Sequence, residues 1–477
     1  MSEHHKLDPD GVFSDGVPFD PVAPDPPAYL DLRRQLAPFQ TPVVVHDNDP
    51  HERLYVASFD GTNDDKRLDR AHETNVGLIS DQIEDLKLAG HPRIAGDYVE
   101  GPGTQQHAPV GRPLDNLFGF SVEERAEQMY KLFITQAWKW KQQDPDAKTS
   151  VVSVSFSRGS EVAALFARMV DERGIQNPTG AIYTYGLHRQ IKHVEYTKPP
   201  LAPPHQVAQG VAMFDPVGTG HAMHDDRRLP PSVISGLQLI ALDELRSFFK
   251  SDHIIDPGIT PDGRFAGMYV PGAHSDGGGG EHRDGLPNRD GNVIIDYLNG
   301  WSDVPFLAKS PEPDDPRLNV IHHSEKANLL YRLAPKVDRQ EPAGYHELQV
   351  PRRMIGHVPD PYNAEPRDEA LSQQFERQAM PNGPLPAAPG QHKESAPSDL
   401  DRWIACMYQA AQQPDPSIWD RVQRTVVQQY MDSPDGRLFQ QQVAALDRTW
   451  DLPLQAQPHP QPAMLDQTLH QSSEACR

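Results

Sequence analysis

The sequence predicts an α/β fold, in which a mainly parallel sheet is flanked by helices and followed by a small C-terminal helical module. Short apolar runs rich in β-branched residues alternate with amphipathic stretches at helical spacing, which is typical of parallel strands joined by helices. Polar residues directly follow several of these runs, at the sheet edge where such folds build their sites. Further amphipathic patterns after residue 398 predict the module.

The composition excludes some classes of function. The chain has 477 residues, with 45 Lys and Arg against 67 Asp and Glu, and a net charge of −22. This balance excludes the usual nucleic-acid binder, which needs a basic surface, and argues against steady attraction to anionic lipid. The 48 prolines and the hydrophobic content of 37% predict a core with long proline-rich surface segments.

The sequence also bears on localisation. It contains no run of about 18 apolar residues, so no transmembrane helix is expected. The first residues lack the basic and apolar regions of a conventional signal peptide. Cys406 and Cys476 both lie in the last fifth of the chain, so no disulfide is expected to organise the fold. We expect a cytoplasmic protein that, where it is exported, leaves its cell without a signal peptide.

The chain divides by composition into five parts. Residues 1–50 are a proline-rich arm expected to lie on the surface, and residues 51–380 form the catalytic domain, with irregular insertions. A linker is predicted over 381–397, the helical module over 398–452, and a disordered Gln/Pro tail over 453–477.

The elements of the first part of the catalytic domain can be read in order. A strand is expected over 53–59, followed by a polar turn, and a helix over 76–86. A longer helix is expected from Ser121 to Trp140, because Ser121 and Glu124 form a capping-box pattern at its start.

The strands that follow each end in a polar residue. The run 151–155 precedes Ser157 and a helical pattern, 210–214 ends at Asp215, and 265–270 leads to His274. Between residues 220 and 260, the apolar residues from Val233 to Phe249 predict either a lid over the site or an ordinary core helix.

Ser157, Asp215 and His274 have the chain order of the Ser–acid–His triad of α/β-hydrolases. A serine hydroxyl becomes an effective nucleophile when an imidazole takes its proton, and the acid orients that imidazole and stabilises its charged form. A serine on a strand-to-helix turn also lies at a helix N-terminus, where the N–H of Arg158 is expected to bind an oxyanion. Gly61 or Thr62 is the expected second donor.

Metal-dependent hydrolysis is an alternative. His221 and His224 stand beside Asp225 and Asp226, which are metal-type ligands, although such clusters are more often solvated loops. Asp60 and Asp276 are further candidate ligands for this alternative. No cofactor is expected for the serine mechanism.

The motifs, taken together, carry a family resemblance. Their order along the chain is Asp60-Gly-Thr-Asn63, Gly101-Pro-Gly-Thr104, Phe156-Ser-Arg-Gly-Ser160, Phe214-Asp-Pro-Val-Gly218, Ala241-Leu-Asp-Glu244 and Pro271-Gly-Ala-His-Ser-Asp-Gly-Gly-Gly279. This set resembles an α/β-hydrolase family of uncharacterised domains that includes type VI secretion phospholipase effectors of the first lipase class. The resemblance covers roughly residues 53–330. This sequence departs from the family pattern at Ser155 and Gly277, where Gly and Val are common, and at Pro216, where Thr is common.

The resemblance implies a lipase that cleaves acyl esters of glycerophospholipids, with Ser157 as nucleophile, His274 as base and Asp215 as acid. Asp243 and Asp276 are fallback acids. The implied partners are a phospholipid substrate, a transiently contacted membrane surface, and a secretion apparatus, adaptor or immunity protein. Two alternatives stay open at this point: a non-lipid esterase, and an interaction protein that keeps a residual hydrolase fold.

Overall fold

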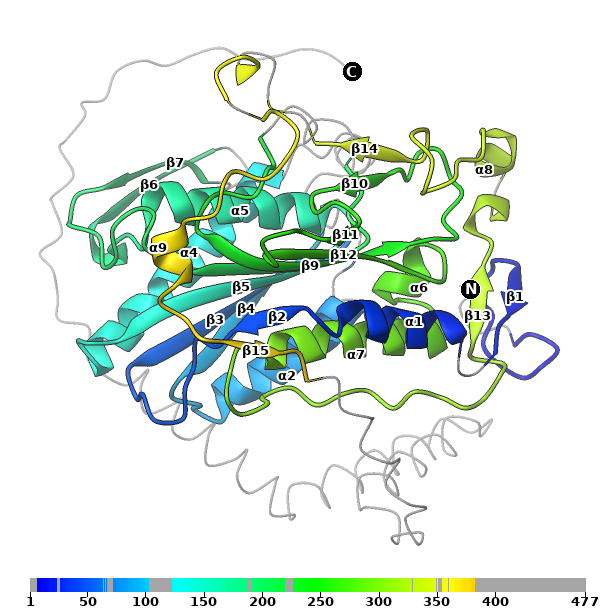
Figure 1. The fold of residues 1–477 in the computed structure, drawn as a ribbon, viewed down its shortest axis with the longest axis horizontal. Coiled ribbons are helices and arrows are strands. Elements are labelled where there is room, and N and C mark those ends of the chain that lie inside the picture. The colour runs from blue at the N-terminus through cyan, green and yellow to red at the C-terminus, as the bar shows by residue number, and fades with distance from the viewer. Residues whose placement is uncertain are drawn as a thin grey trace, which may run out of the picture. The chain divides into compact units, whose positions relative to one another are not determined.

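The computed structural model is built around one central sheet (Figure 1). Among the residues that the structure describes, seven strands form this sheet. Their order across the sheet is β11 (Gly258–Ile259), β12 (Phe265–Val270), β9 (Val233–Ala241), β8 (Gln209–Phe214), β5 (Lys148–Phe156), β3 (Glu52–Phe59) and β4 (Ile94–Val99). All neighbouring pairs are parallel except β11 with β12. The predicted α/β fold with a mainly parallel sheet is confirmed.

The order of the strands reverses once. The chain forms β3 first, adds β4 on one side, and then adds β5, β8, β9 and β12 in succession on the other side. The reversal therefore falls between β3 and β5. In an open α/β sheet, the carboxyl ends of the strands at such a point are where ligands bind.

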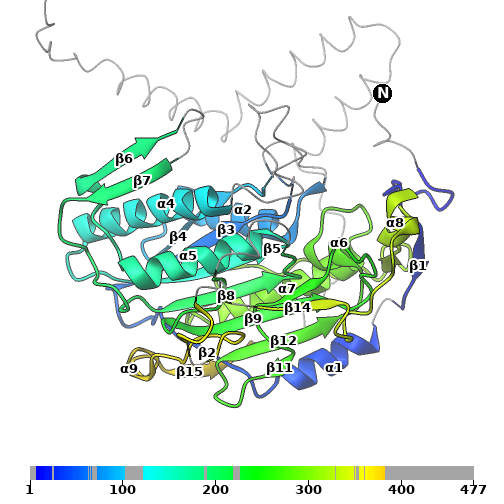
Figure 2. The ribbon, with the colours of Figure 1, turned by 90° about the horizontal axis from the view of Figure 1, so that it is seen from above.

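Helices cover both faces of the sheet (Figures 1 and 2). One face carries α4 (Val122–Gln143) and α5 (Gly159–Arg173), and the other carries α1 (Pro27–Leu36), α2 (Asn75–Leu88) and α7 (Gly285–Asn299). Alternate residues of β3 contribute to the cores on the two faces of the sheet. Leu54 and Val56 belong to the core under α1, α2 and α7, whereas Tyr55 and Ala57 belong to the core under α4 and α5.

Short elements surround this framework. They comprise the strand pairs β1 (Phe19–Pro21) with β13 (Val320–His322), β2 (Gln40–Pro42) with β15 (Arg377–Ala379), β6 (Ala181–Tyr185) with β7 (Ile191–Tyr196) and β10 (Ser251–His253) with β14 (Tyr345–Glu347), and the helices η3 (Pro178–Gly180), α6 (His274–Gly278), η5 (Ser324–Lys326), α8 (Leu329–Leu333) and α9 (Glu369–Ser372). Among the described residues, no helix is both long and apolar enough to cross a bilayer.

The structure describes residues 7–23, 26–62, 64, 66, 72–102, 122–186, 191–218, 226–327, 329–348, 350, 354–358 and 360–381. These belong to one compact unit, Met1–Pro386. Except for Pro381 at the start of the linker, the predicted linker, helical module and tail, with both cysteines, lie outside the described residues. Ser121 and its capping box also lie outside them, whereas the helix predicted to follow is present as α4.

The apolar run that begins at Val233 is a strand rather than a lid or a core helix. Residues 233–241 form β9, which is buried at all nine positions. An apolar run without alternation is typical of a parallel strand covered on both faces. Residues of α7 pack on one face of β9 and residues of α5 on the other. The lid and helix predictions are therefore wrong for residues 233–241.

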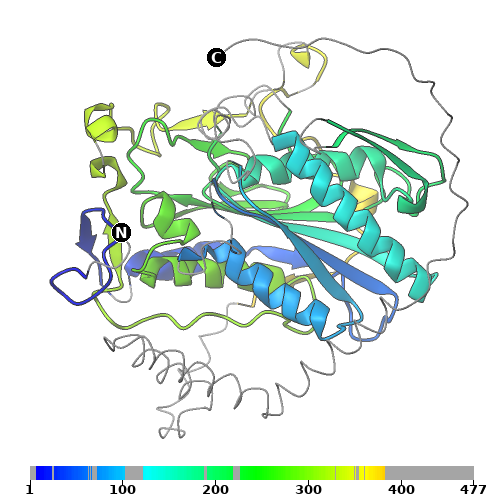
Figure 3. The same cartoon turned by 180° about the vertical axis from the view of Figure 1, so that it is seen from behind.

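The N-terminal segment is built into the fold more deeply than the predicted surface arm. Tyr29, Leu32 and Leu36 form one buried face of α1 and belong to the large core cluster. Figure 3 shows the sheet from behind, with the blue strand β1 beside the yellow-green β13. The sequence analysis predicts no helix here because the segment is rich in proline. Pro27 is nevertheless compatible with helix initiation, since it lies in the first turn.

Candidate active site

Ser157, Asp215 and His274 gather at the carboxyl edge of the sheet. Ser157 follows β5 and Asp215 follows β8, and these two strands pair in register up to Phe156 and Phe214. The two polar residues therefore leave the sheet side by side. His274 begins α6, shortly after β12. The sequence analysis predicted a site where the strands end, and this edge also lies beside the reversal of strand order.

Ser157 occupies a sharp turn between β5 and α5. Its φ is 55°, in the left-handed region that a non-glycine residue rarely adopts. The turn brings Gly159 against the end of β3, where an added Cβ would lie 2.5 Å from the carbonyl oxygens of Phe59 and Asp60. Only glycine permits that approach. The turn is thus the strained nucleophile elbow that the sequence predicts.

Ser155 stands where the related elbow usually has glycine, and its side chain is accommodated. The Ser155 hydroxyl is fully buried and donates to the hydroxyl of Ser160 at 3.1 Å. A buried hydroxyl with a partner avoids the cost of an unpaired polar group. This departure therefore leaves the elbow intact.

The imidazole of His274 links the other two side chains. Nε2 lies 2.8 Å from Ser157 Oγ, and Nδ1 lies 2.6 Å from Asp215 Oδ2. In the neutral tautomer that fits both contacts, Nδ1–H donates to the carboxylate and Nε2 accepts from the hydroxyl. All three side chains are buried. The arrangement can move a proton from Ser157 to His274 while Asp215 stabilises the imidazolium that results.

Arg339 holds the carboxylate of Asp215 from the other side. Its guanidinium donates to both carboxylate oxygens, and the backbone N–H of Ala241 donates to Oδ1 at 3.1 Å. Burial alone would raise the pKa of Asp215, but the charge of Arg339 and the hydrogen bond from His274 outweigh it and lower that pKa. Asp215 is therefore ionised at neutral pH.

Arg339 was not among the residues singled out by sequence. It lies in an irregular proline- and arginine-rich segment, between the short elements α8 and β14, where no periodicity marks any side chain as buried. Its side chain is nonetheless fully buried. A buried arginine requires a carboxylate partner, but no signal in the sequence distinguishes Arg339 from its exposed neighbours.

The predicted oxyanion donors differ in their surroundings. Arg158 begins the turn into α5, with its backbone at the helix N-terminus. The Gly61 N–H donates to Asp60 Oδ1 at 2.8 Å. Thr62 Oγ1 is buried and has no hydrogen-bond partner within the described part of the chain. This geometry favours Arg158 and Thr62 over the Gly61 N–H as donors to an incoming oxyanion.

The fallback acids are committed to other contacts. Asp243 Oδ2 accepts from the N–H of Gly272 at 2.7 Å, and burial raises the pKa of Asp243. Asp276 Oδ2 accepts from the N–H of Ala273 at 2.7 Å. Asp215 is the carboxylate that the described structure brings to the imidazole of His274. Asp243 and Asp276 instead stabilise the loop that carries His274.

A second buried histidine secures the same loop. His322 Nδ1 lies 2.5 Å from Asp276 Oδ1, and its Nε2 lies 3.1 Å from Asp15 Oδ2. Burial lowers the pKa of His322, but the two carboxylates dominate and raise it to about 10. The charged imidazolium thereby ties the N-terminal segment to the helix that starts with His274.

Within the described part of the chain, no acidic or histidine group with metal-like spacing lies at this edge. Asp60 accepts from the hydroxyls of Thr74 and Tyr98. His221, His224 and Asp225 lie outside the described residues, and Asp226 pairs with Arg168 and Arg228. Among the described residues, the acidic and histidine side chains that gather with metal-like spacing are those of His51, Asp144 and Asp146. They lie at the other edge of the sheet, where Asp144 already pairs with Arg53.

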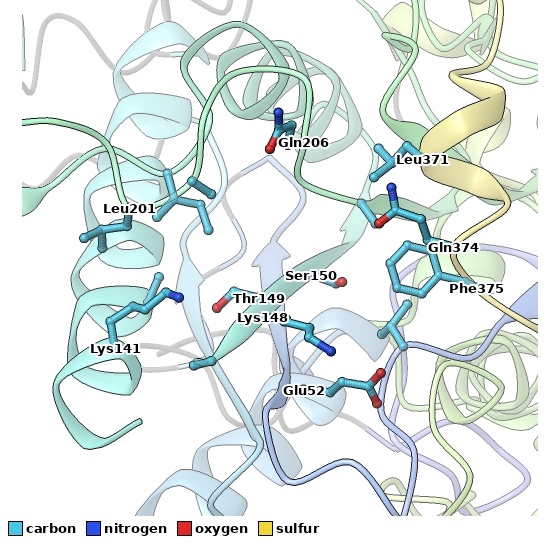
Figure 4. A pocket seen from close by; sticks show the side chains of 16 residues that line it. Glu52, Lys141, Lys148, Thr149, Ser150, Leu201, Gln206, Leu371, Gln374 and Phe375 are labelled. Atoms are coloured by element: carbon cyan, nitrogen blue, oxygen red, sulfur yellow. The ribbon is translucent and has the colours of Figure 1, made fainter. Parts of the chain in front are cut away.

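A cavity of about 340 Å³ also lies away from the triad (Figure 4). Glu52 and Lys148, at the amino ends of β3 and β5, contribute to its wall together with Phe375. Strand amino ends are at the opposite edge from Ser157. The cavity is therefore separate from the polar strand ends.

Solved structures and one family model share similarity with parts of this chain. No curated protein matches the chain. A crystal structure of an uncharacterised protein from Pseudomonas aeruginosa is 15% identical, with a TM-score of 0.38, and the match covers 78% of this chain and 62% of that one. The structure of the Tle1 effector bound to the VgrG spike of the type VI secretion system is 18% identical, with a TM-score of 0.28 and coverages of 50% and 52%. This chain thus covers less than two thirds of either structure.

An acetyl xylan esterase structure is 13% identical, with a TM-score of 0.22, and the match covers 51% of this chain and 96% of the esterase. The family model that matches is the catalytic domain of Tle1-like phospholipase effectors of the type VI secretion system, over residues 53–298. That range is slightly more than half of the chain and contains Ser157, Asp215 and His274. The chain belongs to this Tle1-like family of type VI secretion phospholipase effectors.

Proposed function

We propose that this protein hydrolyses acyl esters of glycerophospholipids with Ser157 as nucleophile, His274 as general base and Asp215 as the acid that orients the histidine. The observation that carries the proposal is the continuous hydrogen-bonded chain from Ser157 Oγ through His274 to Asp215. Family membership supports the choice of a phospholipid over other esters.

Acylation begins when Ser157 Oγ attacks the ester carbonyl carbon and passes its proton to His274 Nε2. The carbonyl oxygen becomes an oxyanion, which the N–H of Arg158 and the Thr62 region stabilise. The intermediate collapses, the bond to the lysophospholipid oxygen breaks, and His274 returns the proton to that oxygen. The fatty acyl group remains on Ser157.

Deacylation repeats these steps with water. His274 takes a proton from the water, whose oxygen attacks the acyl carbon, and the second oxyanion collapses to free fatty acid. Ser157 recovers its proton from His274. Asp215 stays ionised throughout because Arg339 and His274 lower its pKa. The products are one fatty acid and one lysophospholipid.

The biological setting of the proposal is that of an antibacterial effector. The protein is made in the cytoplasm, leaves through a type VI apparatus, and acts on phospholipid of a neighbouring cell. Its partners are the secretion spike or an adaptor, and an immunity protein in the producing cell. Family membership supports this setting.

The test is release of free fatty acid from mixed phospholipid vesicles by the wild type and by Ser157→Ala, each with and without EDTA. Release should fall by about three orders of magnitude or more in Ser157→Ala, because triad members act as a unit, and EDTA should not change it. Release that survives the substitution, or that EDTA abolishes, contradicts the proposal. Hydrolysis of a soluble short-chain ester alone would identify a non-lipid esterase.

A further inference from the structure

An apolar surface lies beside the proposed catalytic histidine. Phe248, Leu329 and Leu333 are 52%, 69% and 77% exposed, and we name these residues the apolar lip. Leu329 and Leu333 are four residues apart on α8, so they lie on the same face of the helix. Figures 1 and 2 show α8 at the same end of the molecule as α6, which carries His274.

A chain of aromatic contacts joins the lip to the site. The ring centroid of Phe249 lies 5.3 Å from that of His274 and 6.2 Å from that of Tyr331. The guanidinium of Arg246 lies over both rings, 3.6 Å from the centroid of Phe249 and 5.1 Å from that of Tyr331. Phe248 is the chain neighbour of Phe249, and Tyr331 belongs to α8. Tyr331, on the helix that carries both leucines of the lip, is thus linked to His274 through the ring of Phe249.

The surroundings of the lip are basic, although the chain carries a net charge of −22. The segments 246–250 and 326–336, which contain the lip, hold no Asp or Glu. They contribute Lys250, Lys326 and Arg332, for which the described structure shows no ion-pair partner. Lys336 is paired with Glu325. Exposed apolar side chains are thus interleaved with unpaired cations.

This combination matches the surface of a phospholipid bilayer. Exposed leucine and phenylalanine side chains gain free energy by entering the boundary between headgroups and acyl chains. Neighbouring lysine and arginine side chains are attracted to anionic headgroups within about a Debye length. A protein partner would have to place carboxylates opposite each of these cations, whereas an anionic bilayer presents negative charge over its whole surface.

We infer that the apolar lip and its basic rim dock the protein onto a bilayer containing anionic phospholipid. The inference rests on the proposed function, since docking here brings ester bonds to the Ser157 and His274 edge. The acidic remainder of the molecule is repelled by the same bilayer, so the local charge selects the orientation in which the site faces the lipid.

Binding can be measured without catalysis. Ser157→Ala is mixed with vesicles of ether-linked lipid, which has no ester to cleave, made of phosphatidylcholine alone or with phosphatidylglycerol. Adding Leu329→Gln and Leu333→Gln should weaken the affinity measured by co-sedimentation about tenfold or more, because two apolar side chains no longer enter the interface. The matched control adds Leu88→Gln and Ile182→Gln, which remove two other exposed apolar side chains, 79% and 55% exposed, and should leave binding unchanged.

The charges are tested separately. Lys326→Glu with Arg332→Glu should reduce binding to vesicles that contain phosphatidylglycerol, and raising the salt concentration should shrink that difference. On phosphatidylcholine alone the same variant should bind as the parent does. Equal loss on both kinds of vesicle would contradict the role assigned to the basic rim.

The outcomes separate the inference from the proposed function. If the lip variant binds vesicles as tightly as its parent, the docking inference is overturned, whatever the active enzyme hydrolyses. If it binds less while the wild type hydrolyses no lipid, the docking surface stands and the phospholipase proposal fails. The lip could instead join two copies of the chain. In that case Leu329→Gln with Leu333→Gln would convert a dimer to a monomer in solution without changing vesicle binding. That outcome would also overturn the inference.

Discussion

The guanidinium of Arg339 donates two hydrogen bonds to the carboxylate of Asp215, at 2.7 Å from Nη1 to Oδ1 and 3.1 Å from Nη2 to Oδ2. The two residues are 124 positions apart in the chain, and both side chains are buried. A two-point contact fixes the plane of the carboxylate as well as its charge. Asp215 Oδ2 is thereby held towards the Nδ1 of His274.

Replacing Arg339 with glutamine should impair the enzyme in a pH-dependent way. The substitution removes the charge that lowers the pKa of Asp215, so burial raises that pKa. Activity needs the ionised carboxylate, and the acidic limb of the kcat/KM profile should therefore move to higher pH. A profile that keeps its position while kcat/KM falls uniformly would indicate a purely structural role.

Arg339→Lys is the companion variant. It keeps the positive charge but loses the two-point geometry, so its acidic limb should stay near that of the wild type while kcat is reduced. Arg339→Gln leaves a buried carboxylate without its cation and should lower the free energy of unfolding by about 3–5 kcal/mol. Chemical denaturation of both variants checks that the activity is measured on folded protein.

The choice of catalytic acid can be tested by matched substitutions. Asp215→Asn should lower kcat by about three orders of magnitude or more, because the amide cannot stabilise the imidazolium of His274. Asp243→Asn changes a carboxylate that braces Gly272 and should cost far less activity. Fatty acid release by the two purified variants shows which carboxylate matters more for activity. A larger loss for Asp243→Asn would contradict the assignment of Asp215 as the acid.

Gly159→Ala should damage the elbow. The new Cβ would lie 2.5 Å from two carbonyl oxygens at the end of β3, and relieving such contacts costs about 1–3 kcal/mol. The melting temperature and the activity should both fall. Gly277→Ala is the control, since its Cβ would meet only Asp290 at an ordinary 3.6 Å. Equal effects of the two substitutions would argue against steric restriction at Gly159.

His322 makes stability depend on pH. Its folded pKa is about 10, above the ordinary value of 6.5, so the stabilisation is complete below about pH 6.5 and is lost as the pH rises through 10. His322→Gln should remove this alkaline decline and lower stability at neutral pH. Urea denaturation between pH 6 and pH 10 measures both effects. A wild-type stability that does not fall over this range would contradict the charged state of His322.

The sheet and the triad edge were predictable because their signals are local. The strands that end near Ser157, Asp215 and His274 are short apolar runs bounded by polar turns, and the elbow has a defined residue pattern. The run that forms β9 was misread because a strand buried on both faces lacks alternation and resembles a buried helix. The domain limits, the localisation and the module after residue 398 stay predictions.

Arg339, His322 and Asp15 could not be found in this way. Each lies in a segment with little periodicity, and each acquires its role from a partner far along the chain. An exposed arginine and a buried one look alike in sequence when no regular element sets their direction. The residues that support the triad are therefore harder to predict than the triad itself.

The position of Arg339 has a consequence for synthesis of the protein on the ribosome. Translation completes Ser157, Asp215 and His274 before it reaches residue 339. A nascent chain, or a fragment that ends with the family-matched region at residue 298, thus carries every member of the triad but not the cation that lowers the pKa of Asp215. The proposed catalytic acid, Asp215, therefore gains its arginine partner only when nearly three quarters of the chain has been made.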